Sequence, residues 1–259
     1  MDDVARFYDD FSDYYHLIFE DWHETIAWQA EAIDRLIGER LGPGPKRILD
    51  ATCGIGTQAL GLAQLGHKVQ GSDLSPVEIA RARREAEGLG LTIPFRVADI
   101  RVLSGYYSGP FDVICTLDNA LPHLEGEGEL NAALVEIAGL LAPGGMFLAS
   151  LRDYDRLMVE RPRWDLPRVF DDAAGQRVVF QVWNWRHDGK GYRFNIYIVQ
   201  NHESGAVDTN VFSGDYWCVT RKQLNDSIAT AGLSEPVWLE PEESGFYQPI
   251  VVARTVATN

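Results

Sequence analysis

Glycine and aspartate residues that follow short apolar runs form the clearest chemical pattern in the sequence. Gly54 and Gly56 lie in Ile48–Thr57, where an apolar run passes into a glycine turn and then into a helical pattern. Glycine lets the backbone approach a ligand where a Cβ atom would clash. Asp73 ends the next apolar run, and Asp99 follows the third. A carboxylate can accept ribose hydroxyls at the first position and an adenine amino group at the second, so the pattern favours an adenosine-containing cofactor.

The same residues leave other interpretations open. Gly54–Ala59 also fits the Gly-x-Gly-x-x-Ala pattern of dinucleotide-binding sites, which makes NAD an alternative cofactor. A tight turn without a ligand, or a helix cap at Asp99, would use the same residue types.

Strands and helices alternate around these residues. Strands are expected at Arg47–Ala51, Lys68–Ser72, Ile93–Val97, Phe111–Thr116 and Met146–Leu151, with helices at Gln58–Leu65, Ser75–Leu89 and Glu129–Leu141. This alternation predicts right-handed βαβ units and an α/β fold with a doubly wound, mostly parallel, seven-stranded sheet. The carboxyl ends of parallel strands share one edge, so the glycine turn and both aspartates are expected to meet there.

Two regions flank this core. The N-terminal region is aromatic and acidic and contains a helical segment that Gly42 ends. After Leu151 the pattern changes to an antiparallel β insertion with strands at Val178–Arg186, Tyr192–Asn201 and Val207–Tyr216. A helix at Arg221–Ala231 and closing strands at Val237–Leu239 and Pro249–Arg254 follow. The predicted regions are 1–45, an N-terminal lid segment; 46–151, the cofactor-binding core; 152–219, the substrate-side insertion; and 220–259, the C-terminal helix and closing strands.

The charge balance restricts the partners. The 259 residues include 38 Asp and Glu against 23 Lys and Arg, a formal net charge of −15. Phosphate backbones are bound mainly by Lys and Arg, so we expect a small-molecule substrate and neither a nucleic acid nor a membrane as partner. No apolar stretch approaches the ~20 residues of a membrane helix. The three cysteines are too far apart for a zinc site or a disulfide framework, so we expect a cytoplasmic protein without a metal.

The stretch Ile48–Leu151 resembles the class I S-adenosylmethionine-dependent methyltransferases. The matching parts are the glycine turn after Asp50, Asp73, Ala98-Asp-Ile100, the strand Phe111–Cys115 and Leu141-Ala-Pro-Gly-Gly145. The resemblance implies S-adenosylmethionine as cofactor, with Asp73 on the ribose, the turn glycines at the methionine end and Asp50 near the amino group. The cofactor-binding residues that we expect are Asp50, Gly54, Gly56, Asp73, Leu74, Asp99, Ile100, Leu117, Tyr8 and Trp22.

A narrower resemblance is to the glycine and sarcosine N-methyltransferases. Leu117–Leu124 is similar to their Leu-Gly-Asn-Ser and His-Leu motifs, with Asp118 in place of glycine and Ala120 in place of serine. Arg152–Asp155 is similar to their Arg-Asn-Tyr-Asp motif. The resemblance implies that Asn119 orients the substrate amine and that Arg152 binds its carboxylate, and it allows a homo-oligomer.

The position of Arg152 also supports a role in binding a carboxylate, independently of the resemblance. A guanidinium just past a strand end can hold a carboxylate through paired, charge-assisted hydrogen bonds. The alternatives are a surface ion pair for Arg152 and a helix cap or turn for Asn119.

The predicted reaction is methyl transfer from S-adenosylmethionine to a small acceptor, such as the amine of glycine or sarcosine. Asn119, Arg152 and Tyr15 are the expected catalytic residues, and aromatic faces suit a sulfonium ion. An amine that arrives neutral requires no strong base, although His123 or His16 could take a proton. The alternatives are an O- or C-methyltransferase for a larger metabolite and an NAD-dependent oxidoreductase.

Overall fold

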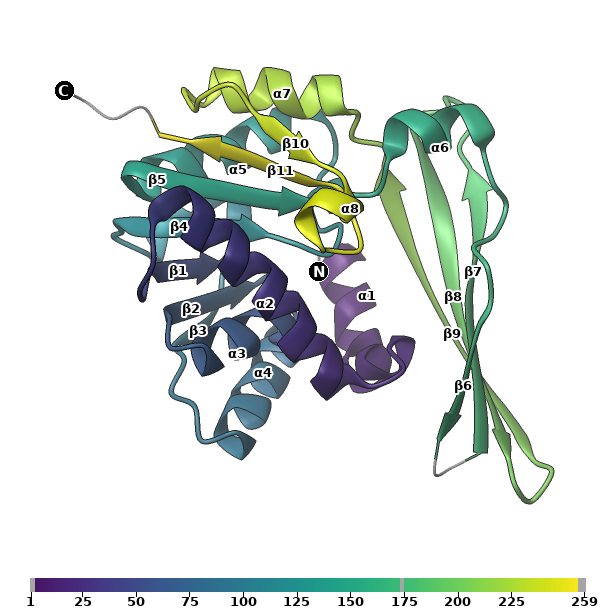
Figure 1. Ribbon diagram of the computed structural model, residues 1–259. Helices are drawn as coiled ribbons and strands as arrows, with labels where there is room; N and C mark the ends of the chain where they lie inside the picture. Colours follow the sequence, from purple (N-terminus) through teal and green to yellow (C-terminus); the bar gives the residue numbers. More distant parts are fainter. Residues whose placement is uncertain (1–2, 173–174, 256–259) are drawn as a thin grey trace.

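Two β-sheets form the framework of the computed structural model, which describes residues 3–172 and 175–255 (Figure 1). The larger sheet has seven strands in the order β10-β11-β5-β4-β1-β2-β3, and the smaller has four in the order β6-β7-β8-β9. The larger sheet is parallel except at β11, which runs antiparallel to both β5 and β10. The predicted doubly wound sheet is confirmed, and the antiparallel insertion forms a sheet of its own.

The strands of the larger sheet are β1 (Arg47–Asp50), β2 (Lys68–Asp73), β3 (Phe95–Val97), β4 (Phe111–Thr116), β5 (Leu141–Ser150), β10 (Val237–Leu239) and β11 (Ile250–Arg254). Those of the smaller sheet are β6 (Arg168–Asp172), β7 (Gly175–Trp185), β8 (Gly191–His202) and β9 (Val207–Trp217). The helices are α1 (Asp3–Phe11), α2 (Trp22–Leu41), α3 (Thr57–Gln64), α4 (Pro76–Gly88), α5 (Glu127–Leu140), α6 (Tyr154–Glu160), α7 (Arg221–Thr230) and α8 (Pro241–Ser244). Short 3₁₀ turns lie at Ser12–Ile18, Ile100–Gly105 and Leu121–His123.

Side-chain caps set the starts of the longer helices. The carboxylate of Asp21 accepts from the His23 and Glu24 amides of α2, and the Ser75 hydroxyl accepts from the Glu78 amide of α4. Thr220 and Gln223 form a reciprocal capping box on α7. Each cap satisfies a backbone donor that the helix itself cannot pair.

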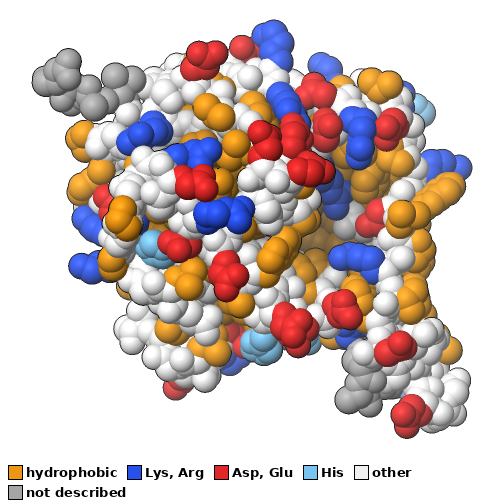
Figure 2. Space-filling model, viewed as in Figure 1, with side chains coloured by type: hydrophobic (Ala, Val, Ile, Leu, Met, Phe, Trp, Pro, Cys, Tyr) orange, Lys and Arg blue, Asp and Glu red, His pale blue; other side chains and the backbone are white. Residues whose placement is uncertain are grey.

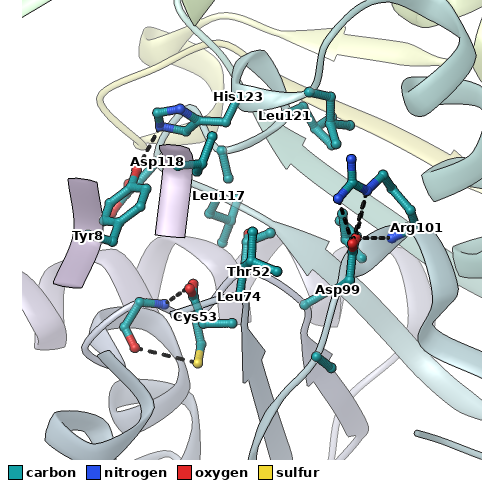
Figure 3. Close-up of a pocket in the computed structure, with 18 of the residues that line it drawn as sticks. Tyr8, Thr52, Cys53, Leu74, Asp99, Arg101, Leu117, Asp118, Leu121 and His123 are labelled. Atoms are coloured by element: carbon teal, nitrogen blue, oxygen red, sulfur yellow. Dashed lines mark hydrogen bonds and ion pairs between the residues drawn. The ribbon is translucent and has the colours of Figure 1, made fainter. Parts of the chain in front are cut away.

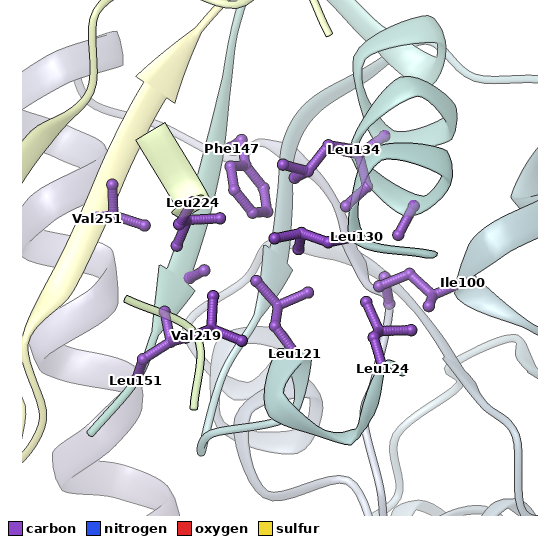
Figure 4. Close-up of a cluster of buried hydrophobic side chains, with 14 of the residues drawn as sticks. Ile100, Leu121, Leu124, Leu130, Leu134, Phe147, Leu151, Val219, Leu224 and Val251 are labelled. Carbon is purple, nitrogen blue, oxygen red and sulfur yellow. The ribbon is translucent and has the colours of Figure 1, made fainter. Parts of the chain in front are cut away.

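The point where the strand order reverses lies at β1, which pairs in parallel with β2 on one side and β4 on the other. Helices α2, α3 and α4 share a core with one face of the sheet, and α5 and α7 share a core with the other. Figure 4 shows the second core, where Leu130 and Leu134 of α5 face Phe147 of β5. Ligands bind doubly wound sheets at the carboxyl ends of the strands beside such a reversal.

The N-terminal segment lies between the α/β body and the four-stranded sheet (Figure 1). The Phe7 ring of α1 packs edge-on against Phe194 of β8, with 5.3 Å between ring centroids. Phe11 packs against Phe212 of β9 at 5.0 Å. The guanidinium of Arg177 in β7 donates to the carbonyl oxygen of Phe19. The aromatic residues at the start of the chain therefore join the insertion to the body.

The structure also contains elements that were not predicted from the sequence. These are α1, α6, α8 and β6, and β5 begins at Leu141 rather than Met146. Helices α6 and α8 and strand β6 are short, so little hydrophobic periodicity marks them. Helix α1 does carry the helical pattern, with Val4, Phe7, Tyr8 and Phe11 on one face, and the sequence interpretation did not use it. Within the described ranges, no helix is both long and apolar enough to cross a membrane. All three cysteines are free and buried.

Contact between α2 and α3 gives a test of this packing. A Cβ atom on Gly61 of α3 would lie 2.6 Å from both the carbonyl oxygen of Ile26 and the Cβ of Ala30 in α2. Gly61→Ala should therefore lower the free energy of unfolding by about 1–3 kcal/mol in denaturant titrations, despite the better helix propensity of alanine. Gly38→Ala in α2 is the control, because a Cβ there meets nothing within 4 Å. The control should gain roughly 0.5–1 kcal/mol, and equal effects of the two changes would contradict the packing.

Candidate active site

A pocket opens at the carboxyl ends of β1, β2 and β4, beside the reversal in strand order (Figure 3). Its walls come from the N-terminal segment, the β1–α3 turn and the loops after β2, β3 and β4. Eight of the predicted site residues line it: Tyr8, Tyr15, Gly54, Asp73, Leu74, Asp99, Ile100 and Leu117. Five predicted residues lie outside its lining: Trp22, Asp50, Gly56, Asn119 and Arg152.

The glycine turn brings the backbone to the pocket wall. Gly54 has a φ of 51°, and a Cβ on it would lie 3.3 Å from a carboxylate oxygen of Glu78 and 3.4 Å from the Tyr15 ring. Gly56, at φ 98°, instead faces Leu60 and Ala82. Gly54 thus gives the pocket its space, while Gly56 lets α3 pack closely.

Asp73 holds the turn and faces the pocket. One carboxylate oxygen accepts from the Gly54 amide at 2.9 Å, and the other accepts from the Ser75 amide at 2.9 Å. Burial raises the pKa of Asp73, and the hydrogen bonds from Ser75, Gly54 and Leu74 oppose that rise. Each carboxylate oxygen has two lone pairs, so Asp73 can still accept hydroxyl hydrogens from a ligand.

An ion pair closes another side of the pocket. The guanidinium of Arg101 donates to both oxygens of Asp99, with its shortest bond at 2.6 Å, and it also pairs with Glu129 (Figure 3). Burial pulls the pKa of Asp99 upward, but the hydrogen bonds and charge of Arg101 outweigh it, and the pKa is lowered. Asp99 is therefore a carboxylate acceptor at the edge of the pocket.

Tyrosine and histidine form a pair on the N-terminal side of the pocket. The Tyr8 hydroxyl and the Nε2 of His123 are 2.9 Å apart (Figure 3). Burial lowers the pKa of His123 to about 3, so its ring is neutral near pH 7. Trp22 instead donates its indole N–H to the Thr57 hydroxyl at 2.9 Å. Trp22 therefore anchors the start of α3 rather than facing the pocket.

Asn119, in the loop that follows β4, and Arg152, just after β5, lie outside the pocket lining. The Asn119 amide donates to the Tyr154 hydroxyl at 2.9 Å, and its oxygen accepts from the Arg152 amide. The Arg152 guanidinium donates to the Tyr192 hydroxyl at 2.8 Å and to the Gln181 side-chain oxygen at 3.2 Å. Both residues are fixed by neutral partners from α6 and the four-stranded sheet.

The Tyr216 ring links Arg152 to the pocket. It lies 5.5 Å from the Arg152 guanidinium carbon and 4.6 Å from the His123 ring, and His123 lines the pocket. Trp183 also lies under the guanidinium, at 5.0 Å. Arg152 forms no ion pair with Asp153, Asp155 or any other described acid. The alternative in which Arg152 forms a surface ion pair is therefore wrong.

Sequence reasoning assigned no role to two polar residues of the pocket, Asp118 and Gln58, and it placed Tyr247 only near the pocket mouth. Asp118 and Gln58 line the pocket, and Tyr247 donates to a carboxylate oxygen of Asp118. The replacement of glycine by Asp118 in the post-β4 motif was a signal. Nothing local in the sequence connects Gln58 of α3 or Tyr247 of the C-terminal loop with this carboxylate.

The known proteins to which this chain is similar are methyltransferases. Residues 48–145 match the methyltransferase domain family. The chain is 30% identical over 153 residues to the glycine/sarcosine N-methyltransferase of Parasynechococcus marenigrum, covering 59% of this chain and 53% of that protein. It is 38% identical over 122 residues to the ubiquinone biosynthesis O-methyltransferase of Methylocella silvestris, covering 46% and 45%. The chain thus spans about half the length of the curated relatives it matches.

The fold has close neighbours among solved structures. DesVI of Streptomyces venezuelae superposes with a TM-score of 0.79 at 20% identity, covering 94% of this chain and 98% of that one. At this identity the likeness concerns the fold, including the added four-stranded sheet region, and not the substrate.

Asp50 gives a pH-dependent test of the site. Its side chain is fully buried, and neither carboxylate oxygen makes a hydrogen bond of ordinary geometry. Burial raises the pKa to about 8, the charges of Asp118 and Asp73 add to the rise, and the amides of Thr52 and Ala59 oppose it. The folded state therefore holds a proton that the unfolded chain, with a pKa near 3.9, releases.

Stability that depends on this proton is present below about pH 4 and is lost as pH rises towards 8. Relative to Asp50→Asn, the wild type should lose unfolding free energy between pH 5 and 8, by at most about 1.4 kcal/mol per pH unit. Urea titrations of both proteins at pH 5, 6.5 and 8 measure the difference. A constant difference across this range would show that Asp50 is ionised in the folded state.

Proposed function

We propose that this chain, whose residues 48–145 belong to the class I S-adenosylmethionine-dependent methyltransferases, transfers a methyl group from S-adenosylmethionine to the amine of a small amino acid such as glycine or sarcosine. The family match and the fold support the reaction class and the cofactor. The acceptor is inferred from the surroundings of Arg152.

The pocket at the carboxyl edge fits an adenosine-containing cofactor. Asp73 has free lone pairs for ribose hydroxyls, and the space beside Gly54 is one that a Cβ would fill. Asp99, Ile100 and Leu117 would hold the base. S-adenosylmethionine supplies an activated methyl group, so the protein's part is to bind it, align the acceptor and exclude water.

Arg152 is the observation that supports an acceptor with a carboxylate. The guanidinium is always charged, yet its hydrogen-bond acceptors are neutral, and two aromatic rings flank it. Its charge opposes the burial that raises the pKa of Asp165, but the two side chains form no direct ion pair. A partly buried cation that lacks a direct ion pair is stabilised by an incoming anion that accepts bonds in its fork geometry. A carboxylate on the substrate would supply that charge.

Tyr8 and Tyr15 are suited to the space between cofactor and acceptor. Both line the pocket, and burial raises the pKa of each hydroxyl well above its usual value, so both remain neutral. Neutral aromatic rings attract a sulfonium without competing for the methyl group. The neutral His123 ring beside Tyr8 also leaves an incoming amine free of a repelling cation.

O-methylation of a larger metabolite is the second candidate. A wider hollow lies beside the pocket and shares four lining residues with it: Val4, His123, Leu124 and Glu125. The similarity to ubiquinone biosynthesis O-methyltransferases supports this candidate over the NAD-dependent oxidoreductase. Acidic and basic side chains are mixed across the face in Figure 2, so its charge favours neither candidate.

Asp73 tests the cofactor assignment. Asp73→Ala should weaken the binding of S-adenosylhomocysteine at least tenfold by calorimetry, because a charged acceptor contributes about 1.5–3 kcal/mol. Asp112→Asn is the matched control, since Asp112 also accepts from a backbone amide but at the opposite edge of the sheet. An unaltered Kd for Asp73→Ala in a folded protein would contradict its ribose role.

Arg152 tests the acceptor assignment. The wild type should release S-adenosylhomocysteine when supplied with glycine or sarcosine, but not with phenol. Arg152→Ala should raise the KM for the amino acid at least tenfold, and Arg152→Lys by less, because lysine keeps the charge but not the fork. Arg156→Ala, an exposed residue of α6, should change neither KM nor cofactor affinity. An unchanged KM in Arg152→Ala would exclude the carboxylate contact.

A further inference from the structure

The carboxylate of Asp118 is a negative charge at the pocket wall that no side chain neutralises. One oxygen accepts from the Gln58 amide at 2.7 Å, and the other accepts from the Tyr247 hydroxyl at 2.8 Å. Among the described residues, no Lys, Arg or His forms an ion pair with it. Burial raises the pKa of Asp118, and the two neutral donors oppose the rise.

These partners hold the carboxylate in a fixed place. The Gln58 amide donates its other hydrogen to the Gln29 side-chain oxygen at 2.6 Å, and both glutamines are buried. The Asp118 amide donates to the Ser150 hydroxyl, which in turn donates to the Gln248 side chain. The Asp118 carboxylate is thus positioned by residues from four elements: helices α2 and α3, strand β5 and the C-terminal loop.

The backbone at this point is also unusual. Asp118 and Asn119 have φ values of 54° and 65°, the left-handed region that non-glycine residues seldom adopt. The turn directs Asn119 away from the pocket, where its amide binds Tyr154 and the Arg152 backbone. The same turn leaves Asp118 in the pocket lining. Strain of this kind is retained where the surrounding structure requires it, often at a functional site.

We propose that Asp118 binds the acceptor's ammonium group and receives its proton before methyl transfer. This inference rests on the proposed function and adds the charge of the acceptor. The reacting end of the acceptor is a cation, and its other end is the anion that Arg152 would hold. An amino acid zwitterion carries both of the charges that these two side chains would bind. A hydroxyl acceptor would leave Asp118 without a counter-ion.

The proton balance of the step is complete. The ammonium passes one proton to Asp118, which leaves a neutral amine. The amine lone pair forms the N–C bond as the C–S bond breaks, and the electron pair of that bond stays on sulfur. The products are S-adenosylhomocysteine and a methylated ammonium, and Asp118 then releases its proton to water.

Asp118→Asn is the decisive variant, because asparagine tolerates a positive φ and has the same shape. The probes are glycine and glycolate, which share a carboxylate but differ in the amine. Both are titrated by calorimetry into protein saturated with S-adenosylhomocysteine, so no turnover is needed. Glu31→Gln, on the exposed face of α2, is the control for loss of one negative charge.

The wild type and the control should bind glycine at least tenfold more tightly than glycolate. Asp118→Asn should lose this preference, with its Kd for S-adenosylhomocysteine unchanged within twofold. Tyr247→Phe, which keeps the charge but removes one donor, should retain most of the preference. A preserved preference in Asp118→Asn would overturn the proposal. Weakened S-adenosylhomocysteine binding in that variant would also overturn it, because Asp118 would then serve the cofactor's amino group.

Failure of the proposed function gives a different result. If the wild type binds neither glycine nor glycolate, the amino acid assignment fails, and the Asp118 comparison is repeated with ethanolamine and ethylene glycol. A preference for ethanolamine that Asp118→Asn removes would support the ammonium contact without the carboxylate contact. No preference in either pair overturns the role of Asp118.

Discussion

The burial of three carboxyl groups at the carboxyl edge of the parallel sheet is the constraint on which the site depends. The fold places the ends of β1, β2 and β4 together, and Asp50, Asp73 and Asp118 follow or end those strands. Each carboxylate loses hydration there, and each has a raised pKa for that reason. Asp73 and Asp118 are stabilised by neutral donors, whereas Asp50 is stabilised by holding a proton. The edge is thus prepared for polar or cationic ligands before any ligand binds.

The rest of the molecule encloses this edge. The N-terminal segment brings Tyr8 and Tyr15 over it, and its aromatic contacts with β8 and β9 couple the body to the four-stranded sheet. That sheet holds Arg152 through Tyr192 and Gln181. Segments that are distant in sequence therefore meet around this edge of the sheet.

The core could be predicted from the sequence because each local signal there agrees with the global fold. The strand Phe111–Thr116 and the closing strand Val237–Leu239 have the predicted bounds, and the Ser75 and Thr220 caps begin the predicted helices. The placement of Asn119, Trp22 and Arg152 depends on tertiary contacts instead. Asn119 turns away from the pocket because of two successive positive φ angles, and no spacing rule reveals that. The part of Gln58 and Tyr247 in the site likewise follows only from the meeting of α3 with the C-terminal loop.

The net charge of −15 takes a specific meaning beside this geometry. Exposed acids act at long range and are screened within about 10 Å at ordinary salt, so they disfavour polyanions but do little inside a pocket. Within the site, the Arg152 cation has no acid partner and the Asp118 anion has no basic partner among the described residues. Pairing these two residues with each other would have cancelled both charges. The structure instead holds each charge with neutral groups: Gln58 and Tyr247 donate to Asp118, and Tyr192 and Gln181 accept from Arg152. Such an arrangement costs desolvation energy, which an incoming group of opposite charge would offset at each residue.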